Sequence, residues 1–234
     1  MNFVKRSIYR FLWLPYATGG YDVNGKRYCS KFLRCIDYLK GVSIARQQIN
    51  YLKPLFIKEC EGDVVEIGGF DNYFKSIYTR GRFLNLDQVC NEHVDIVCNA
   101  EDMGIFADNS LGAFICVSVL EHTRNPELIV KGISRCLRHG GRAFISTPWL
   151  FEQHMEPQDY CRFSRYLMES YFEQASLKVL FYQPSNSFFG VVAHILQRIR
   201  PLCYSIGLLF FLVDLFAEAD DTYSIQLHFI VAKQ

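Results

Sequence analysis

The stretch Val64-Val-Glu-Ile-Gly-Gly-Phe-Asp-Asn72 decides the fold, because an apolar strand pattern runs directly into a glycine turn. A second apolar stretch, Arg82-Phe-Leu-Asn-Leu-Asp87, ends in an acid that follows Gly68 by 19 residues. In open α/β sheets, this spacing places a glycine turn beside a carboxylate that can bind the hydroxyls of a ribose. The two stretches therefore predict a nucleotide site at the carboxyl edge of a parallel sheet.

Strand and helix patterns alternate through the residues that follow. Helical spacing predicts a short helix over 73–79, a helix that begins at Pro126 and ends at Gly140-Gly141, and a helix over 165–174. Besides the two strands above, apolar runs predict strands at 94–98, 113–118, 142–147, 178–182 and 224–231. This alternation predicts an α/β fold with a seven-stranded, mostly parallel sheet and helices on both faces. We expect a helical segment over residues 1–61 and one domain over 62–234, with an apolar insertion at about 183–220 before the last strand.

Charge and cysteine usage exclude several classes of protein. The chain has 25 Lys and Arg against 24 Asp and Glu, a net charge of +1. This balance argues against a nucleic-acid partner, because phosphate binding needs a basic surface. The nine cysteines are scattered and contain no C-x-x-C pair, so we expect neither disulfides nor a bound metal. Free thiols of this kind indicate a reducing compartment, and we expect a cytoplasmic protein.

Two apolar segments, 3–15 and 202–213, are too short to span a membrane. Each is interpreted either as a helix buried in its own domain or as an amphipathic segment that lies on a membrane or over a substrate. Under the second interpretation, the protein contacts the inner face of the membrane peripherally.

The composition of the glycine turn narrows the choice of nucleotide. Dinucleotide sites use G-x-G-x-x-G so that the backbone approaches a pyrophosphate, but Phe70 and Tyr73 occupy the third and sixth positions here. The sequence also lacks a phosphate-binding G-x-x-x-x-G-K-[ST] motif. S-adenosylmethionine (SAM) has a sulfonium and an amino-acid tail in place of the pyrophosphate, so its site tolerates fewer glycines. Glu66 would then be an acceptor near the cationic end of SAM.

Five motifs in a fixed order carry a family resemblance. They are Val64-Val-Glu-Ile-Gly-Gly69, Asn85-Leu-Asp87, Asn99-Ala-Glu-Asp102 with Phe106-Ala-Asp-Asn-Ser110, Val117-Ser-Val-Leu-Glu-His122 with Asn125-Pro126, and Gly140-Gly-Arg-Ala-Phe-Ile-Ser-Thr-Pro148. With these motifs, the chain resembles the class I, SAM-dependent methyltransferases of the type 11 kind over about residues 62–179. The resemblance implies a Rossmann-like fold, methyltransferase activity and SAM as the cofactor. The residues predicted to bind SAM are Glu66, Gly68, Gly69, Asp87, Glu101, Asp102, Val117 and Ser118.

The resemblance also implies where individual residues lie on the cofactor. Gly68 lines the methionine end of SAM, Asp87 binds the ribose hydroxyls, Glu101 and Asp102 border the adenine, and residues 117–119 lie beneath the cofactor. The chain departs from the family at Phe70, where members usually have a further glycine. A side chain at that position would narrow the methionine pocket.

The loop after the fifth predicted strand gathers polar side chains suited to catalysis. His154, Asp159, Tyr160 and Arg162 lie within nine residues of one another, in a loop that leaves the carboxyl edge of the sheet. We predict that His154 accepts the proton of a hydroxyl acceptor and that Asp159 orients its imidazole. The alternative is a structural loop, in which Asp159 and Arg162 form an ion pair and His154 is a hydrogen-bonded strut. His122, after the fourth strand, is predicted either on the substrate side or as a support for its own loop.

Together these features predict a SAM-dependent methyltransferase that acts on a small molecule or glycan. A sugar hydroxyl in surface-polysaccharide biosynthesis is an acceptor suggested by analogy with bacterial chains of this kind. One alternative is a hydrophobic acceptor such as a quinone or a lipid, favoured by the 20 Phe and 14 Tyr. Another is a non-catalytic, methyltransferase-like binding or scaffold domain, favoured by Phe70.

Overall fold

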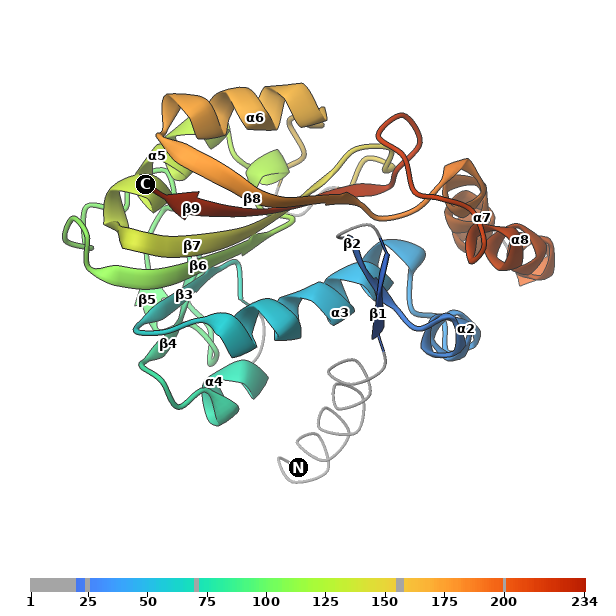
Figure 1. Cartoon of the computed structure of the whole chain (residues 1–234), viewed down its shortest axis with the longest axis horizontal. Helices are drawn as coiled ribbons and strands as arrows, with labels where there is room; N and C mark the ends of the chain where they lie inside the picture. Colours follow the sequence, from blue (N-terminus) through green and yellow to red (C-terminus); the bar gives the residue numbers. More distant parts are fainter. Residues whose placement is uncertain (1–19, 24–25, 70–71, 155–157, 200) are drawn as a thin grey trace. The chain divides into compact units, whose positions relative to one another are not determined.

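The structure of the chain is a computed structural model that describes residues 20–23, 26–69, 72–154, 158–199 and 201–234 (Figure 1). Its contacts divide the chain into two compact units. The first unit contains the residues up to Lys58 together with Trp149–Phe151 and Gln183–Leu227. The second unit contains Glu59–Pro148, Glu152–Tyr182 and His228–Gln234. The domain boundary that the sequence predicts between residues 61 and 62 stays a prediction.

A seven-stranded sheet forms the centre of the second unit. Its strands are β3 (Val64–Ile67), β4 (Phe83–Asp87), β5 (Ile96–Val97), β6 (Leu111–Val117), β7 (Leu137–Pro148), β8 (Leu177–Pro184) and β9 (Gln226–Lys233). They lie in the order β5-β4-β3-β6-β7-β9-β8, mostly parallel with an antiparallel end (Figure 1). The chain runs outward from β3 to β4 and β5, then returns to β6 on the other side of β3. Ligands of open α/β sheets bind at such a reversal, outside the carboxyl ends of the strands.

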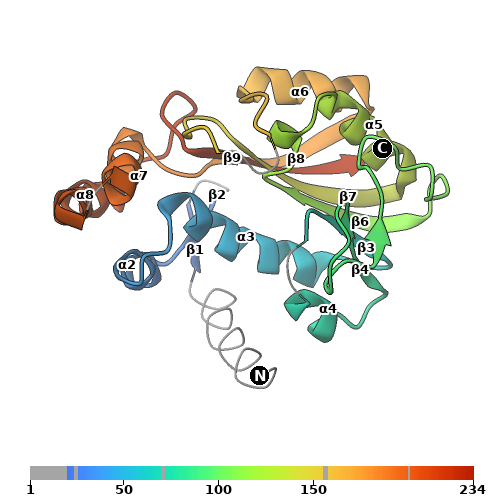
Figure 2. The ribbon, with the colours of Figure 1, turned by 180° about the vertical axis from the view of Figure 1, so that it is seen from behind.

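The central strands are apolar on both faces because helices cover the sheet on each side. All four residues of β3 are buried, and so are the first six of β6. Helices α5 (Pro126–Cys136) and α6 (Arg165–Gln174) lie on one face of the sheet, and α4 (Tyr73–Ile77) lies on the other (Figures 1 and 2). The short helix η1 (Leu120–His122) follows β6 and carries two residues of the site described below.

The structure confirms the predicted fold class, but the bounds of several elements differ from the prediction. The segment predicted to be helical over 1–61 also contains two strands, Gly20–Val23 and Lys26–Cys29, because these residues pair with each other as a hairpin. The predicted helix end at Gly140-Gly141 is wrong, because α5 ends at Cys136 and β7 begins at Leu137. Leu137 is fully buried and pairs with Leu111 in the ladder between β6 and β7, so tertiary pairing ends the helix before the glycines do. The strand predicted at 94–98 is reduced to β5, Ile96–Val97.

The first unit is mainly helical. It contains the hairpin of β1 (Gly20–Val23) and β2 (Lys26–Cys29) and the helices α2 (Lys31–Leu39), α7 (Phe188–Ile199) and α8 (Pro201–Asp214), and most of α3 (Ile44–Glu59). In its core, Tyr38 stacks on Phe211 with ring centroids 4.6 Å apart. Arg34 donates to the Asp214 carboxylate at 2.8 Å in a buried ion pair, which joins α2 to the end of α8.

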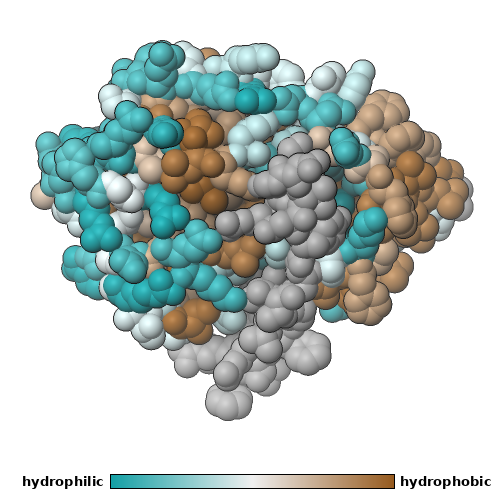
Figure 3. Space-filling view, in the orientation of Figure 1, coloured by the Kyte–Doolittle hydropathy of each residue, from teal (hydrophilic) through white to brown (hydrophobic). Residues whose placement is uncertain are grey.

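Helices α7 and α8 form the predicted apolar insertion and leave a large apolar surface exposed. Its exposed side chains are Phe188, Phe189, Ile195, Ile199, Ile206, Leu209, Leu212, Val213 and Phe216. These residues are called the α7–α8 face below, and Figure 3 shows apolar residues gathered over these two helices. None of the helices in the described ranges is both long enough and apolar enough to cross a membrane.

Candidate active site

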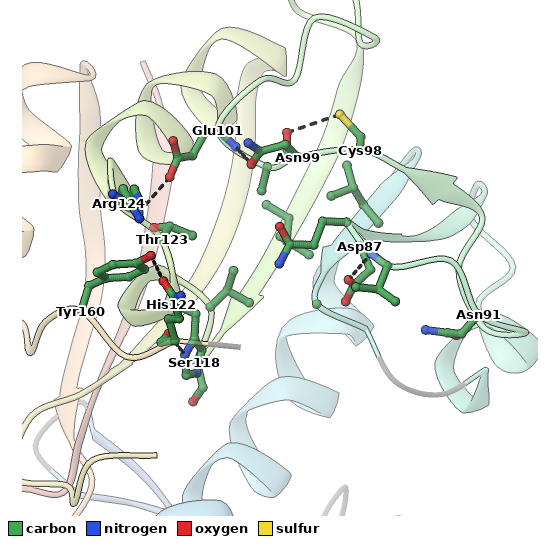
Figure 4. A pocket seen from close by; sticks show the side chains of 18 residues that line it. Asp87, Asn91, Cys98, Asn99, Glu101, Ser118, His122, Thr123, Arg124 and Tyr160 are labelled. Carbon is green, nitrogen blue, oxygen red and sulfur yellow. Dashed lines mark hydrogen bonds between the residues drawn. The ribbon is translucent and has the colours of Figure 1, made fainter. Parts of the chain in front are cut away.

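A cavity of about 790 Å³ opens at the carboxyl edge of the sheet (Figure 4). Its walls come from the ends of β3, β4 and β6 and from the loop after β5, which is the predicted place for a nucleotide. The lining residues are Ile67, Gly68, Leu86, Asp87, Gln88, Val89, Asn91, Cys98, Asn99, Ala100, Glu101, Ser118, Val119, His122, Thr123, Arg124, Gln158 and Tyr160. All of them belong to the second unit.

The floor of the cavity requires glycine at position 68. Gly68 has a φ of +72°, and a Cβ added to it would lie 2.7 Å from the Cγ2 atom of Val119. Ser118 also adopts a left-handed conformation, with a φ of +52°, and its N–H donates to the Ser146 carbonyl at 2.9 Å. Since a non-glycine residue is strained there, the backbone at the end of β6 is held in an uncommon shape beside the cavity.

Two acids on the cavity wall differ in how their carboxylates are used. Asp87 ends β4, and its Oδ1 atom accepts the N–H of Val89 at 2.9 Å, which fixes the carboxylate at the wall (Figure 4). Glu101 accepts the N–H groups of Arg124 and Asn125 at 2.9 and 3.0 Å and the Asn125 side-chain amide at 2.9 Å. These donors, the Asn125 amide first, hold the pKa of Glu101 below its usual value of 4.5.

Some of the predicted SAM-binding residues lie outside the cavity lining. Asp87, Gly68, Glu101 and Ser118 line the cavity, whereas the lining contains none of Glu66, Gly69, Asp102 and Val117. Glu66 is buried within β3 at the level of Asn85 and Ile115. A Cβ added to Gly69 would lie 2.6 Å from Asn85 Oδ1, so this glycine is required by packing against β4. Phe70, on which the non-catalytic alternative depended, lies outside the described residues.

A cluster of ionisable side chains borders the cavity at His122. The imidazole of His154 lies edge-on to that of His122, with ring centroids 4.6 Å apart. Asp159 Oδ2 lies 3.3 Å from His154 Nδ1 and accepts the backbone N–H of His154 at 2.9 Å. Arg162 binds both Asp159 oxygens, with Nη2 2.6 Å from Oδ2, and lowers the pKa of Asp159 to about 2. The predicted pairing of His154 with Asp159 and the ion pair of the alternative interpretation are both present.

Sequence reasoning did not assign a role to Glu121, the buried member of this cluster. Its side chain is fully buried in η1, and its Oε1 atom lies 3.9 Å from His122 Nε2 and 3.8 Å from His154 Nε2. Neither carboxylate oxygen has a hydrogen-bond partner among the described residues. Burial therefore raises the pKa of Glu121 to about 8. The Glu-His pair after β6 was a visible signal, but the burial of its first member was not.

The comparisons with known proteins concern the family and the fold of the chain. The sequence matches none of the curated proteins, but residues 77–145 match the family model described as a methyltransferase domain. The chain therefore contains a methyltransferase domain, which together with its fold indicates a SAM-dependent methyltransferase. The family resemblance, the enzyme class and the cofactor that the sequence predicts are thereby confirmed.

Three solved structures have a similar fold to this methyltransferase. One is the YcgJ protein of Bacillus subtilis, at 14% identity and a TM-score of 0.51, covering 77% of this chain and 97% of that one. Another is geranyl diphosphate C-methyltransferase from Streptomyces coelicolor, solved with Mg²⁺, geranyl diphosphate and S-adenosyl-L-homocysteine, at 10% identity, a TM-score of 0.52 and 82% of each chain. The third is the Haloferax volcanii chain in complex with the Trm112 methyltransferase activator, at 15% identity, a TM-score of 0.53, and 77% and 87% of the two chains. At these identities, the likeness concerns the fold.

The cavity of the methyltransferase suits SAM. The backbone at Gly68 leaves room that any side chain would fill, and the volume of about 790 Å³ is in the usual range for a cofactor of this size. Asp87 places a carboxylate at the end of β4, where a ribose hydroxyl is expected, and Oδ2 has no partner among the described residues. The walls of the cavity combine apolar and polar groups, as the adenosine of SAM requires.

Proposed function

We propose that this methyltransferase transfers the methyl group of SAM to a hydroxyl of a small molecule or glycan. The observation that carries the proposal is the His154–Asp159 pair beside His122, which itself lines the cavity. A hydroxyl is a weak nucleophile until its proton is removed, and an imidazole held by a carboxylate is suited to that task. A neutral amine would need no such base, because its nitrogen already carries a free electron pair.

The residues of the cluster have distinct tasks in this proposal. SAM, when bound, supplies an electrophilic methyl group whose bond to sulfur breaks as the acceptor oxygen attacks. His154 accepts the hydroxyl proton, and Asp159 holds its Nδ1 and stabilises the imidazolium. Because Arg162 keeps Asp159 ionised, Asp159 orients the imidazole without taking the proton. His122 contacts the acceptor at the cavity wall.

For SAM itself, we propose four contacts from the cavity wall. Asp87 binds the ribose hydroxyls, Gly68 leaves room for the methionine end, and Ser118 lies beneath the cofactor. Glu101 borders the adenine. Because its oxygens already accept three hydrogen bonds from Arg124 and Asn125, it acts chiefly by fixing the loop that these two residues belong to. Glu66, Gly69, Asp102 and Val117 would act behind the wall or at its margin.

The acceptor class is proposed from the α7–α8 face. An acceptor sugar carried on a lipid, as in surface-polysaccharide biosynthesis, is presented at a membrane, and an exposed apolar face can rest on the inner surface of that membrane from the cytoplasm. Leu209, on α8, is 64% exposed. The same face favours the second candidate, in which the acceptor is itself a lipid or a quinone.

Methyl transfer from labelled SAM tests the proposed function directly. The full chain is incubated with sugar glycosides, lipid-linked sugars, quinols and amines, and the labelled product is identified. Transfer to a sugar hydroxyl supports the main proposal, and transfer to a quinol or a lipid hydroxyl supports the second candidate. Transfer confined to amines, or none to any hydroxyl, contradicts both.

Vesicle flotation tests the membrane contact. We expect the wild-type chain to float with vesicles of anionic phospholipid and the Leu209→Glu variant to stay in the soluble fraction. Tyr166→Glu is the matched control, because Tyr166 is 80% exposed on α6 and belongs to the second unit. Equal flotation of all three proteins, or none by the wild type, contradicts a role for the α7–α8 face.

A further inference from the structure

Three side chains with lone pairs converge beside the cavity. They are Glu121, His122 and His154, and one ligand atom from each lies within 4.8 Å of the others. Glu121 comes from η1, directly before His122, and His154 comes from the loop after β7. The backbone N–H of Tyr160 donates to the Glu121 carbonyl at 2.7 Å, so the two segments are tied together close to the cluster.

The outer nitrogen of each imidazole faces an acceptor. His122 Nδ1 lies 2.6 Å from the Gln158 carbonyl oxygen, and His154 Nδ1 lies 3.3 Å from Asp159 Oδ2. Because oxygen acceptors hold the proton on Nδ1, the lone pair of each imidazole is on Nε2, the atom nearest Glu121. An imidazole whose Nδ1–H is held by a carboxylate or carbonyl is the arrangement that proteins use to orient metal ligands.

Glu121 gives the second, independent observation. Its carboxylate is fully buried, and both oxygens lack a hydrogen-bond partner within the described part of the chain. A buried polar group without a partner is costly, and a carboxylate facing two imidazole lone pairs is surrounded by further acceptors. The guanidinium of Arg162, in the loop after β7, is engaged by Asp159 and by the Glu152 carbonyl. One carboxylate oxygen and two imidazole nitrogens therefore lie together, and such a set of ligand atoms suits a cation.

We propose that Glu121, His122 and His154 bind a divalent transition-metal ion through one carboxylate oxygen and two Nε2 atoms. Two imidazoles and one carboxylate suit Zn²⁺ and its first-row neighbours better than Mg²⁺, which prefers oxygen ligands. Metal–ligand distances near 2.0 to 2.2 Å require the three side chains to move inward by a small amount. The expectation of no metal rested on the cysteine pattern, which does not report on a site of this composition.

The role that we give to the ion rests on the proposed function, whereas the binding of the ion to the three side chains does not. Three protein ligands leave a position open for the acceptor oxygen, and His122 borders the cavity. A bound ion would lower the pKa of the hydroxyl it holds; the proton would leave to bulk water, and the electron pair of the oxygen would attack the methyl group as the bond of that group to sulfur breaks. With the ion bound, His154 is a ligand, and Asp159 orients it in the same way.

Calorimetric titration of the chelator-treated full chain with ZnCl₂ tests the site without SAM or acceptor. We expect one ion per chain, with Mg²⁺ binding at least tenfold more weakly. Glu121→Gln and His154→Gln should each weaken Zn²⁺ binding at least tenfold, whereas His139→Gln, an exposed histidine outside the cluster, should leave it unchanged. His154 is about a third exposed, so its variant keeps the test open if substitution of the buried Glu121 disturbs folding.

Absence of binding at one ion per chain, or equal binding by the wild type and by a folded cluster variant, overturns the proposal. SAM affinity and methyl transfer, measured separately on the same samples, report on the proposed function. A protein that binds Zn²⁺ through the cluster but methylates no hydroxyl keeps the metal site and loses the proposed reaction. A protein that methylates a hydroxyl but does not bind Zn²⁺ through the cluster has no metal site there, and His154 then acts as the base.

Discussion

Glu101 and Glu121 are two glutamates at the same edge of the sheet with opposite environments. Glu101 accepts three hydrogen bonds, two of them from backbone N–H groups, and its pKa lies below 4.5. Glu121 accepts none among the described residues, and burial raises its pKa to about 8. The fold supplies donors to the first carboxylate, whereas the residues that the structure describes supply none to the second.

This difference separates the cavity from the cluster that borders it at His122, and we propose different tasks for the two. The cavity wall around Asp87 and Glu101 is built from acids whose orientation the backbone fixes, which suits a cofactor bound in one pose. The cluster of Glu121, His122 and His154 presents acceptors to one another, which suits a cation or a proton. Buried groups that a fold leaves unpaired deserve a functional explanation more than those it satisfies.

Substitution of His154 should have the largest effect, and it should slow methyl transfer without changing the affinity for SAM. We expect His154→Ala to lower kcat about 10²- to 10⁴-fold, the range for loss of a group that activates a nucleophile. The Kd for SAM should stay unchanged, because His154 is not part of the cavity lining. Single-turnover kinetics and calorimetry measure the two quantities, with His139→Ala as the control. A variant that loses SAM affinity instead would mean that the cavity and the cluster are not separate.

Substitution of Asp87 should have the next largest effect, on the cavity. Hydrogen bonds to a charged acceptor contribute about 1.5 to 3 kcal/mol, so Asp87→Ala should weaken SAM binding about 10- to 100-fold. Glu92→Ala is the matched control, since Glu92 is an exposed acid after the same strand and is not part of the cavity lining. Calorimetry with SAM and with S-adenosylhomocysteine measures both. If the wild type and Asp87→Ala bound SAM with equal affinity, Asp87 would not bind the ribose of SAM.

The positions of Gly68 and Asp87 could be predicted from the sequence more readily than the environment of Glu121, and the reason is physical. A glycine turn and a strand-end acid are local features, so Gly68 and Asp87 could be assigned from their spacing, and the structure places both on the cavity wall. The helix over 165–174 was also predicted from a local pattern, and it has the predicted bounds. Ser164 caps its start by accepting the N–H of Leu167. Patterns of this kind need no knowledge of distant residues.

Features that depend on distant residues were missed or placed inaccurately. The early end of α5 is set by the pairing of Leu137 with Leu111, which helical spacing does not reveal. The state of Glu121 depends on a loop more than 30 residues further along the chain, whose His154 lies 3.8 Å away. A sequence shows that Glu121 precedes a histidine, but only the packing shows that both its oxygens are buried and that no described residue donates to them.

Parallel substitutions of the two glutamates should change stability in opposite directions. In the chelator-treated protein, Glu101→Gln should lower the free energy of unfolding by about 1 kcal/mol, because a charge-assisted hydrogen bond at the start of α5 is lost. Glu121→Gln should raise it by a similar amount, since a neutral amide avoids the cost of burying a group that is ionised in the unfolded chain. Urea unfolding measures both, and equal losses in the two variants would contradict the comparison.

The smallest expected effect is the pH dependence of the Glu101 contribution. Its pKa in the folded chain is below the usual 4.5 of an unfolded chain, so its stabilisation is fully present above pH 4.5 and is lost as the pH falls through the folded value. The difference in Tm between wild type and Glu101→Gln should therefore be constant near neutral pH and shrink below pH 4.5. Glu92→Gln, at an exposed acid, should show no such change. A difference that stays constant into acid would mean that the three donors bind Glu101 no better than water does.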